Sequence, residues 1–451
     1  MRTKIIARSR VSLTRRADMR TLPWAFVGAG LLCACGGRTP LDILSIQGQR
    51  VSTDAGLGPD AAFGQDAGFS PDAGLGPDAG FGPDAGFGPD AGLGSDATPS
   101  RCAWEIAPEV LYPAMSSAMS VAAGDMDGDG HLDLVVGNLN GQTISIFHNQ
   151  GDGTFATQVT YRNFQPQSLA LGDFDGDGRP DVVASNGNGS TVTVFRNVGG
   201  GKLDNGTSYA VGGYPNAIAL ADFDGDGHLD IASANNTGAS VSILRNLGDG
   251  TFAAQVAVAF GSRPQGIAAG DFDGDGHPDL VATSWGFLGQ TWVPPMVGVL
   301  HNNGDGSFAL QATYTPGSVP NGVAVADLDG DGHLDLVVGD DSSMIRVFLN
   351  QGDGTFAAPT LLAAGFGPAH VAIADFDGDG HLDIATANYE DITLSLFLNN
   401  GDGTFALSTT VSVGQFPAGV TAADLNGDGY PDLALASFGS NSLGVLLSRC
   451  R

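Results

Sequence analysis

An acidic motif of nine residues recurs seven times along this chain of 451 residues and constrains its fold more than any other feature. One copy, DFDGDGHLD, has aspartates at positions 1, 3, 5 and 9. The copies start at Asp125, Asp173, Asp222, Asp271, Asp327, Asp375 and Asp424, at intervals of 48, 49, 49, 56, 48 and 49 residues. A period in this range is typical of a solenoid or a propeller.

The content of each repeat decides between these two architectures. Short runs of Val, Ile, Leu and Phe, such as residues 132–138 and 143–149, alternate with Gly, Asn and Asp turns and show no helical periodicity. Four such runs fit in each repeat, the last of them after a hairpin of the GDGTF type. Four antiparallel strands per repeat predict an all-β fold, a seven-bladed β-propeller over residues 101–451.

The two ends of the repeat region indicate how the ring closes. After the seventh motif the chain stops before a fourth strand, and a spare strand-like segment, 102–112, precedes the first motif. We therefore expect this segment to complete the last blade. In an exported protein, Cys102 and Cys450 would then form a disulfide across the missing hairpin. Two unrelated free thiols are the alternative.

Residues 1–34 differ from the rest of the chain. Seven Lys or Arg residues precede a short apolar run, 22–32, which is typical of an export signal and too short for a spanning helix. The run ends in LCAC, which looks like a bacterial lipobox with Cys35 as the lipidated residue. We predict a lipoprotein of the bacterial cell envelope, at the outer membrane, with Met19 as a possible true start. A plain cleaved signal is the alternative.

Residues 35–100 form the predicted anchor and linker. Within them, residues 54–97 repeat a unit of six residues built from Asp, Gly, Pro and Ala with one larger apolar residue. Such a unit cannot bury enough apolar surface to offset the entropy lost on ordering. The sequence therefore predicts a disordered, solvated tether.

The formal net charge of −30 has a specific origin in the repeats. An acidic chain does not suit a phosphate backbone, so we expect no nucleic-acid partner. The pattern D-x-D-x-D-G-x-x-D matches the first nine positions of an EF-hand loop, in which side chains at positions 1, 3, 5 and 9 and the carbonyl at position 7 bind calcium. An all-oxygen set favours Ca²⁺ over zinc and copper. Magnesium suits the set less well, because it keeps its waters and prefers a smaller octahedral site. A metal-free Asx-turn is the alternative.

The sequence thus predicts about seven calcium sites, with the residue at position 7 acting through its backbone carbonyl. The predicted ligands are Asp125, Asp127, Asp129, His131 and Asp133; Asp173, Asp175, Asp177, Arg179 and Asp181; Asp222, Asp224, Asp226, His228 and Asp230; Asp271, Asp273, Asp275, His277 and Asp279; Asp327, Asp329, Asp331, His333 and Asp335; Asp375, Asp377, Asp379, His381 and Asp383; and Asp424, Asn426, Asp428, Tyr430 and Asp432.

Two other positions of the motif attract functional interpretations. Position 7 is histidine in five repeats but Arg179 and Tyr430 in the others. We therefore expect its side chain to take no part in metal binding or catalysis. Position 2 is phenylalanine in four repeats, which we interpret as a core residue rather than a binding stripe. The sequence contains no GxSxG, HExxH or P-loop motif.

The repeats resemble the FG-GAP/VCBS family of calcium-loop propellers, which includes integrin α-subunit heads. The stretch VAIADFDGDGHLDIATAN, residues 371–388, is close to the family consensus. The resemblance covers about residues 102–451. It implies calcium in the loops between strands 1 and 2 on one face, and adhesion or ligand binding on the other. Family members have no single activity, so the fold does not fix the function.

The face opposite the acidic loops carries the variable loops. The fourth repeat alone has an insertion, 284–296, with Trp285 and Trp292 as predicted ligand contacts; a plug over the central channel is the alternative.

We expect a monomeric, lipid-anchored binding or adhesion module for a surface protein or glycan, joined to the membrane only through its lipid. A lectin, or a polysaccharide hydrolase or lyase, is the alternative. The latter would need the scattered acids Asp340, Asp341, Glu390 and Asp391, beside which the sequence shows no histidine or arginine partner.

Overall fold

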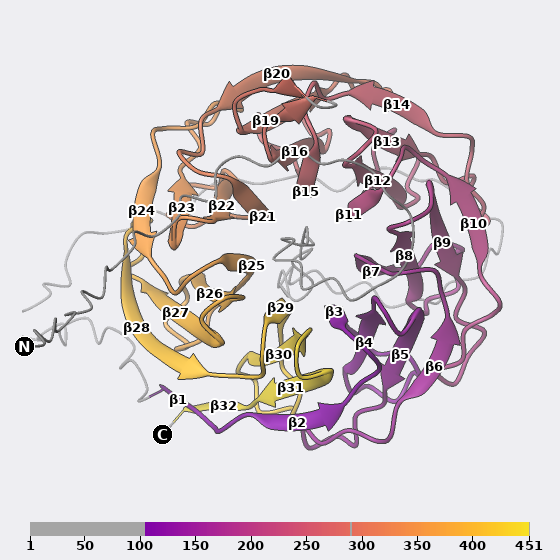
Figure 1. Ribbon diagram of the computed structural model, residues 1–451, viewed down its shortest axis with the longest axis vertical. Coiled ribbons are helices and arrows are strands. Elements are labelled where there is room, and N and C mark those ends of the chain that lie inside the picture. The colour runs from indigo at the N-terminus through magenta and orange to yellow at the C-terminus, as the bar shows by residue number, and fades with distance from the viewer. Residues whose placement is uncertain (1–103, 289–290, 451) are drawn as a thin grey trace, which may run out of the picture. The chain divides into compact units, whose positions relative to one another are not determined.

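The computed structural model describes residues 104–288 and 291–450. In this part of the chain all regular structure is β, and seven four-stranded antiparallel sheets are arranged around a common axis (Figure 1). The predicted seven-bladed propeller is confirmed. No helix among the described residues is long and apolar enough to cross a membrane.

Each of the first three blades is a continuous meander. Blade 1 consists of β3 (Ala118–Gly124), β4 (Asp133–Asn138), β5 (Thr143–Phe147) and β6 (Val159–Arg162). Blade 2 consists of β7 (Leu169–Gly172), β8 (Asp181–Asn186), β9 (Thr191–Phe195) and β10 (Thr207–Ala210). Blade 3 consists of β11 (Pro215–Ala221), β12 (Asp230–Asn235), β13 (Ser240–Leu244) and β14 (Val256–Ala259).

The next three blades repeat the plan, with an inserted hairpin in blade 4. Blade 4 consists of β15 (Pro264–Gly270), β16 (Asp279–Ser284), β19 (Met296–Asn302) and β20 (Phe308–Tyr314), and its hairpin of β17 (Phe287–Leu288) and β18 (Thr291–Trp292). Blade 5 consists of β21 (Pro320–Ala326), β22 (Asp335–Asp340), β23 (Met344–Phe348) and β24 (Thr360–Ala363). Blade 6 consists of β25 (Pro368–Ala374), β26 (Asp383–Asn388), β27 (Thr393–Asn399) and β28 (Phe405–Ser412).

Blade 7 joins the two ends of the repeat region, as expected. Its strands are β29 (Pro417–Ala423), β30 (Asp432–Ser437), β31 (Ser442–Leu446) and, from the start of the described chain, β2 (Val110–Pro113). A further pair, β1 (Trp104–Ile106) with β32 (Ser448–Cys450), sets the backbone of Cys450 beside that of Trp104. Cys102 lies outside the described residues, so the disulfide stays a prediction.

The core lies between neighbouring blades rather than in one central mass. The first strand of each blade lines the axis and the fourth lies at the periphery (Figure 1), and the second strands are buried along their whole length. One apolar cluster, for example, joins Leu134 and Phe147 of blade 1 to Leu425 and Leu443 of blade 7. Because each sheet has two buried faces, no blade can bury its apolar side chains without its neighbours.

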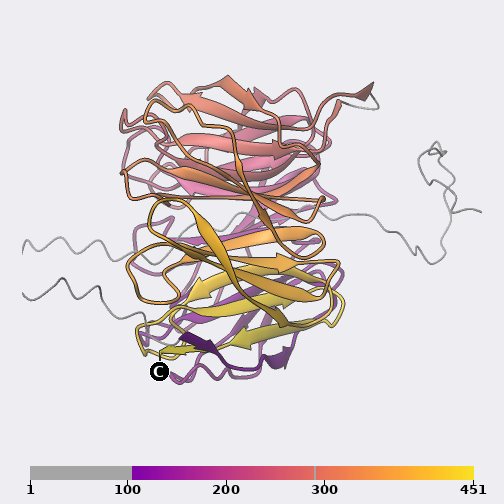
Figure 2. The ribbon, with the colours of Figure 1, turned by 90° about the vertical axis from the view of Figure 1, so that its left-hand side faces the viewer.

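The meander places two kinds of loop on opposite faces of the ring. The acidic loops join strands 1 and 2, so they share a face with the hairpins between strands 3 and 4. The connections between strands 2 and 3, and from one blade to the next, share the other face. Figure 2, a side view, shows the β17–β18 hairpin projecting beyond the ring.

Candidate metal centres

Each acidic loop is folded around its first aspartate. In blade 1, Asp125 Oδ1 accepts a hydrogen bond from the backbone N–H of Gly128 at 2.7 Å, and Oδ2 accepts one from Gly130 at 2.9 Å. Both glycines have positive φ, 82° and 90°, which explains why the motif requires them. The same two bonds recur in the other six loops, down to the loop that begins at Asp424.

The aspartate at position 9 of the motif is buried at the start of the second strand of its blade. Asp133 is 1% exposed; its Oδ2 accepts from Met126 N at 3.0 Å and its Oδ1 from Asn149 N at 2.8 Å. Burial raises the pKa of this carboxyl, and the neighbouring loop carboxylates raise it further in most blades, against the effect of its hydrogen bonds. The pKa rises to about 7 for Asp383 and Asp432.

The loops bring the predicted ligand side chains together. In blade 1, oxygens of Asp125, Asp127 and Asp129 lie within 4.8 Å of one another. In blades 2 and 3 the groups within that distance combine positions 1, 3 and 9, as in Asp173, Asp175 and Asp181. In blade 7 the side chain of Asn426 takes the third position and accepts from Asp428 N at 2.9 Å.

The donor set fits a hard cation such as Ca²⁺. All the converging side-chain atoms of these groups are oxygens, most of them anionic, which suits Ca²⁺. In blades 2 and 3, the third-position atoms Asp175 Oδ1 and Asp224 Oδ1 are buried and have no hydrogen-bond partner, although Oδ2 of each carboxylate pairs with an arginine. An unpartnered buried carboxylate oxygen is costly, and a bound cation would satisfy it.

The side chain at position 7 contacts the hairpin of its own blade in blades 1 to 6. A Cβ atom added to Gly352, in the hairpin of blade 5, would lie 2.8 Å from His333 Nε2. The same close approach joins the position-7 histidine and the hairpin glycine in blades 1, 3, 4 and 6. In blade 2, Arg179 Nε instead donates to Asn197 O at 3.0 Å. This residue therefore packs or bonds its hairpin against its own acidic loop. The phenylalanines at position 2 are core residues, as predicted: Phe174, Phe223, Phe272 and Phe376 are at most 1% exposed.

An asparagine begins the hairpin between strands 3 and 4 in blades 1 to 6, and its role was not predicted from the sequence. Its side-chain amide donates twice, to the eighth-position carbonyl of its own loop and to the second-position carbonyl of the preceding blade's loop. The interblade bonds are Asn149–Leu425, Asn197–Met126, Asn246–Phe174, Asn302–Phe223, Asn350–Phe272 and Asn399–Leu328, at 2.7 to 2.9 Å. The recurrence of Asn before the GDGTF hairpin was the available signal.

Blade 7 departs from this scheme. Ser448 stands where the other blades have asparagine, and its Oγ donates to Pro431 O of its own loop at 2.8 Å. A serine has no amide with which to reach blade 6. Ile106 of β1 packs against the apolar cluster that joins blades 6 and 7. The N-terminal segment thus contributes to the junction that lacks the asparagine.

On the opposite face, the inserted hairpin is held at its base and exposed at its end. Phe287 O accepts from Arg263 N at 2.9 Å, and the Arg263 guanidinium lies 5.9 Å from the Phe287 ring. Trp292 is 63% exposed, whereas Trp285 is half-buried. No partner is present, so the contact role of both tryptophans stays a prediction.

One scattered acid has an arginine partner, contrary to our reading of the sequence. Asp340 is fully buried, and its Oδ2 accepts from Arg346 Nε at 2.6 Å. Its Oδ1 also accepts from Ser342 N at 2.7 Å. The carboxylate is thereby neutralised and hydrogen-bonded within blade 5, so Asp340 has a structural role. Asp341 Oδ1 accepts from Asn321 Nδ2 at 3.3 Å, and Asp391 Oδ2 from Phe366 N at 2.8 Å.

The chain was compared with curated proteins and with solved structures. A search of curated proteins found no match. A chain in the crystal structure of BBS1N in complex with ARL6DN, 13% identical, aligns with a TM-score of 0.56 over 77% of this chain and 97% of its own. An Agrocybe aegerita lectin that recognises non-reducing terminal N-acetylglucosamine, 23% identical, aligns with a TM-score of 0.47 over 72% and 86%. The first of these likenesses concerns the fold alone.

The repeats themselves match a family directly. The FG-GAP-like repeat matches residues 125–184, 173–233, 222–282, 294–338, 327–386 and 375–435. Each match except the fourth begins at the first aspartate of an acidic loop and extends through the next motif. Together they cover most of the propeller. The chain therefore belongs to the FG-GAP-like repeat family.

Proposed function

We propose that this protein is a calcium-stabilised, lipid-anchored binding module that recognises a protein or glycan outside the cytoplasm. The observation that carries the proposal is the convergence of carboxylate oxygens in the loops, with unpartnered buried oxygens at Asp175 and Asp224. In blade 2, Asp173, Asp175, Asp177 and Asp181 would hold the ion with the Arg179 carbonyl. Bound Ca²⁺ would neutralise the clustered carboxylates.

The asparagine bridges explain how cations would stiffen the whole ring. In blade 2 the loop that would hold the ion also presents Phe174 O, the acceptor of Asn246 in blade 3. The backbone N–H of Asn246 in turn donates to Asp230, a predicted ligand of the blade 3 loop. Fixing one loop therefore fixes an acceptor for the next blade. A ring held in this way would present the opposite face as a rigid surface, which lowers the entropic cost of binding.

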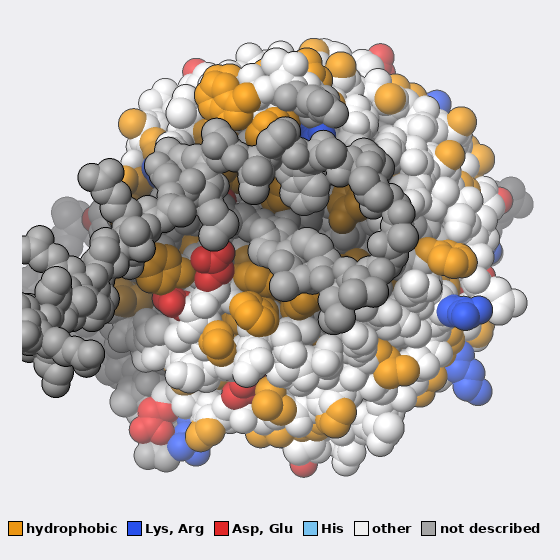
Figure 3. All heavy atoms as spheres, viewed as in Figure 1, with side chains coloured by type: hydrophobic (Ala, Val, Ile, Leu, Met, Phe, Trp, Pro, Cys, Tyr) orange, Lys and Arg blue, Asp and Glu red, His pale blue; other side chains and the backbone are white. Residues whose placement is uncertain are grey.

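The face opposite the acidic loops supplies the recognition surface in this proposal. Figure 3 looks onto a face where hydrophobic side chains lie over several blades and acidic ones are few. Exposed apolar side chains in the interblade connections and the inserted hairpin include Phe164, Phe366 and Trp292, at 73%, 60% and 63% exposed. Exposed aromatic side chains are common anchors of protein and glycan recognition.

The anchor and the compartment belong to the proposal as well. Residues 1–34 would direct export, Cys35 would carry the lipid, and residues up to 100 would form the tether; all lie outside the described residues. The proposed location is the bacterial cell envelope at the outer membrane. We infer a monomeric propeller, joined to the membrane only by the lipid. We expect no nucleic-acid partner, because a chain with a formal net charge of −30 does not suit a phosphate backbone.

The alternative within the same class is a lectin, which would bind sugars on this face. A hydrolase or lyase is the less favoured alternative, because Asp340 is committed to Arg346 and Asp391 accepts a backbone N–H. A catalytic acid or base needs access to its substrate.

A binding screen with matched variants tests the proposal. The full chain would be applied to a glycan array and to an array of purified cell-surface proteins, in Ca²⁺ and in chelator. We expect binding that needs Ca²⁺ and falls at least tenfold in Trp292→Ala but not in Leu247→Ala, a control 64% exposed on the acidic-loop face. Binding that is the same in chelator and in Trp292→Ala would contradict it. Release of reducing ends from a polysaccharide would instead favour the enzyme.

A further inference from the structure

The residue just before the bridging asparagine, or just before Ser448 in blade 7, differs in its chemistry among the blades. It is His148 in blade 1 and His301 in blade 4, arginine in blades 2 and 3, and leucine at 349, 398 and 447 in blades 5 to 7. In blades 2 and 3 the guanidinium pairs with the third-position carboxylate, Arg196 with Asp175 at 3.8 Å and Arg245 with Asp224 at 3.3 Å. The leucines offer no donor at all.

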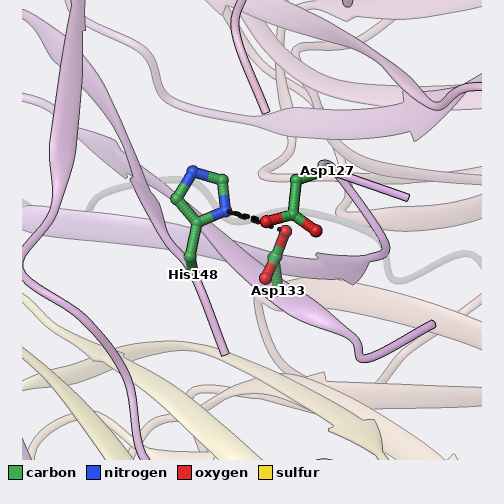
Figure 4. A group of neighbouring side chains, drawn as sticks. All are labelled: Asp127, Asp133 and His148. Atoms are coloured by element: carbon green, nitrogen blue, oxygen red, sulfur yellow. Dashed lines mark hydrogen bonds and ion pairs between the residues drawn. The ribbon is translucent and has the colours of Figure 1, made fainter. Parts of the chain in front are cut away.

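In blades 1 and 4 this position adds an imidazole nitrogen to two carboxylates. His148 Nδ1 lies 3.1 Å from Asp133 Oδ2 and 3.5 Å from Asp127 Oδ2 (Figure 4). His301 Nδ1 lies 3.2 Å from both Asp273 Oδ2 and Asp279 Oδ1. In each blade the three ligand atoms lie within 4.8 Å of one another. Two blades that are not neighbours have thus acquired the same set of one nitrogen and two oxygens.

The separations match those of ligands around a small cation. Zinc binds imidazole nitrogen at about 2.0–2.1 Å and carboxylate oxygen at about 2.0–2.2 Å, so two such ligands at a tetrahedral angle lie about 3.3–3.5 Å apart. The nitrogen–oxygen distances of 3.1 to 3.5 Å fall close to that edge length. His301 Nδ1 is moreover a buried atom that forms no hydrogen bond, although two carboxylates face it, whereas His148 Nδ1 forms a hydrogen bond with Asp133 Oδ2.

The chemistry of this set differs from that of the other five loops. Calcium prefers oxygen ligands, whereas imidazole suits borderline transition metals. The side chains of His148 and Asp127 are 23% and 28% exposed, and those of His301 and Asp273 are 28% and 19% exposed. Water can therefore complete the coordination of an ion at either site.

We propose that the loops of blades 1 and 4 bind a divalent cation of the Zn²⁺ class, each through one histidine and two aspartates, while the other five loops take Ca²⁺. This inference rests on the proposed role of the loops as cation sites and assigns two of them a different ion. His148 and His301 are the residues that determine the specificity.

Cobalt(II) is a direct probe, because its visible absorption reports nitrogen coordination and low coordination number. The full chain, saturated with Ca²⁺, would be titrated with Co²⁺ and the bound Co²⁺ then displaced with Zn²⁺. We expect two equivalents of Co²⁺ with intense visible bands. His148→Leu and His301→Leu should each lose one equivalent, and the double variant should lose both. Leucine is the natural residue at this position in blades 5 to 7, so these variants should fold.

A gain-of-site variant keeps the test independent of folding defects. Leu398→His in blade 6 should bring an imidazole to Asp377 and Asp383 and add a third equivalent. Co²⁺ binding that is unchanged in the double variant, or absent in saturating Ca²⁺, would overturn the inference. The melting temperature with and without Ca²⁺, recorded on the same samples, separates the two ideas. A Ca²⁺-dependent rise without Co²⁺ bands refutes only the histidine sites, whereas no effect of Ca²⁺ refutes the proposed scaffold role.

Discussion

The side-chain amide of Asn246 in blade 3 donates a hydrogen bond to the main-chain carbonyl of Phe174 in blade 2, at 2.9 Å and in a buried position. Its second N–H donates to Leu229 O at 3.1 Å, within the loop of its own blade. One amide therefore ties two neighbouring acidic loops to each other. Equivalent amides make the corresponding contact at five other junctions.

Removing this amide should destabilise the ring. In Asn246→Ala, two carbonyls lose their donor, which we expect to lower the free energy of unfolding by about 1–3 kcal/mol. Asn303→Ala is the control, because that asparagine is exposed and bonds only within its own hairpin; its effect should stay within about 0.5 kcal/mol. Urea denaturation of both variants in Ca²⁺ provides the measurement. Equal effects would show that the bridge contributes nothing.

His333 of the acidic loop packs against Gly352 of the hairpin in blade 5, so a larger residue at 352 should clash with the imidazole. This steric cost can be separated from backbone strain. Gly352 and Gly330 in blade 5 both have positive φ, 80° and 77°, but only Gly352 has a neighbour, His333 Nε2, within 4 Å of an added Cβ. Gly330→Ala should therefore cost only the backbone strain, about 1–2 kcal/mol. Gly352→Ala should cost more.

The double variant Gly352→Ala/His333→Ala checks the cause of that difference. Without the imidazole, the cost relative to His333→Ala should fall to that of Gly330→Ala. Thermal melting in Ca²⁺ gives the comparison. A Gly352→Ala cost that persists without His333 would assign the effect to the backbone alone.

Stability in the absence of cations should decrease as the pH rises. Burial raises the pKa of Asp383 and Asp432 from 3.8 to about 7 in the folded chain. Between these values the folded chain holds more protons than the unfolded chain, so the free energy of unfolding falls with increasing pH. This contribution is fully present below about pH 4 and lost as the pH passes through about 7.

Melting curves in chelator across this pH range give the measurement. Asp383→Asn is neutral at every pH and should show a shallower decline than the parent chain. Saturating Ca²⁺ should stabilise the parent most at neutral pH, where its loop carboxylates are ionised. A melting temperature that rises steadily from pH 5 to pH 8 in chelator would contradict the assigned shifts.

Much of this architecture could be predicted because the same pattern of strands and loops recurs in every repeat. The spacing of the aspartates located the loops, and the missing fourth strand after Asp432 predicted that β2 completes blade 7. What could not be predicted were contacts between repeats. That Asn246 reaches Phe174, 72 residues earlier, depends on how neighbouring blades are stacked and twisted, which periodicity does not encode.

The residues that vary within the repeat were the hardest to interpret. His148 and His301 occupy a position that is arginine or leucine elsewhere, so repeat comparison alone marks the position as tolerant. Only the fold shows that this side chain faces Asp127 and Asp133 of the same blade. Likewise, the pairing of Asp340 with Arg346 could not be predicted, because the two side chains meet only when β22 and β23 align.

Calorimetric titration of the full chain with Ca²⁺, with the melting temperature recorded in parallel, would show whether calcium binds the acidic loops and stabilises the ring. We expect at least five Ca²⁺ sites and a large rise in melting temperature, because an ion that binds only the folded ring stabilises it by mass action, increasingly as the concentration of free Ca²⁺ exceeds the Kd. A folded chain that binds no Ca²⁺, and melts at the same temperature with and without it, would refute calcium stabilisation of the propeller.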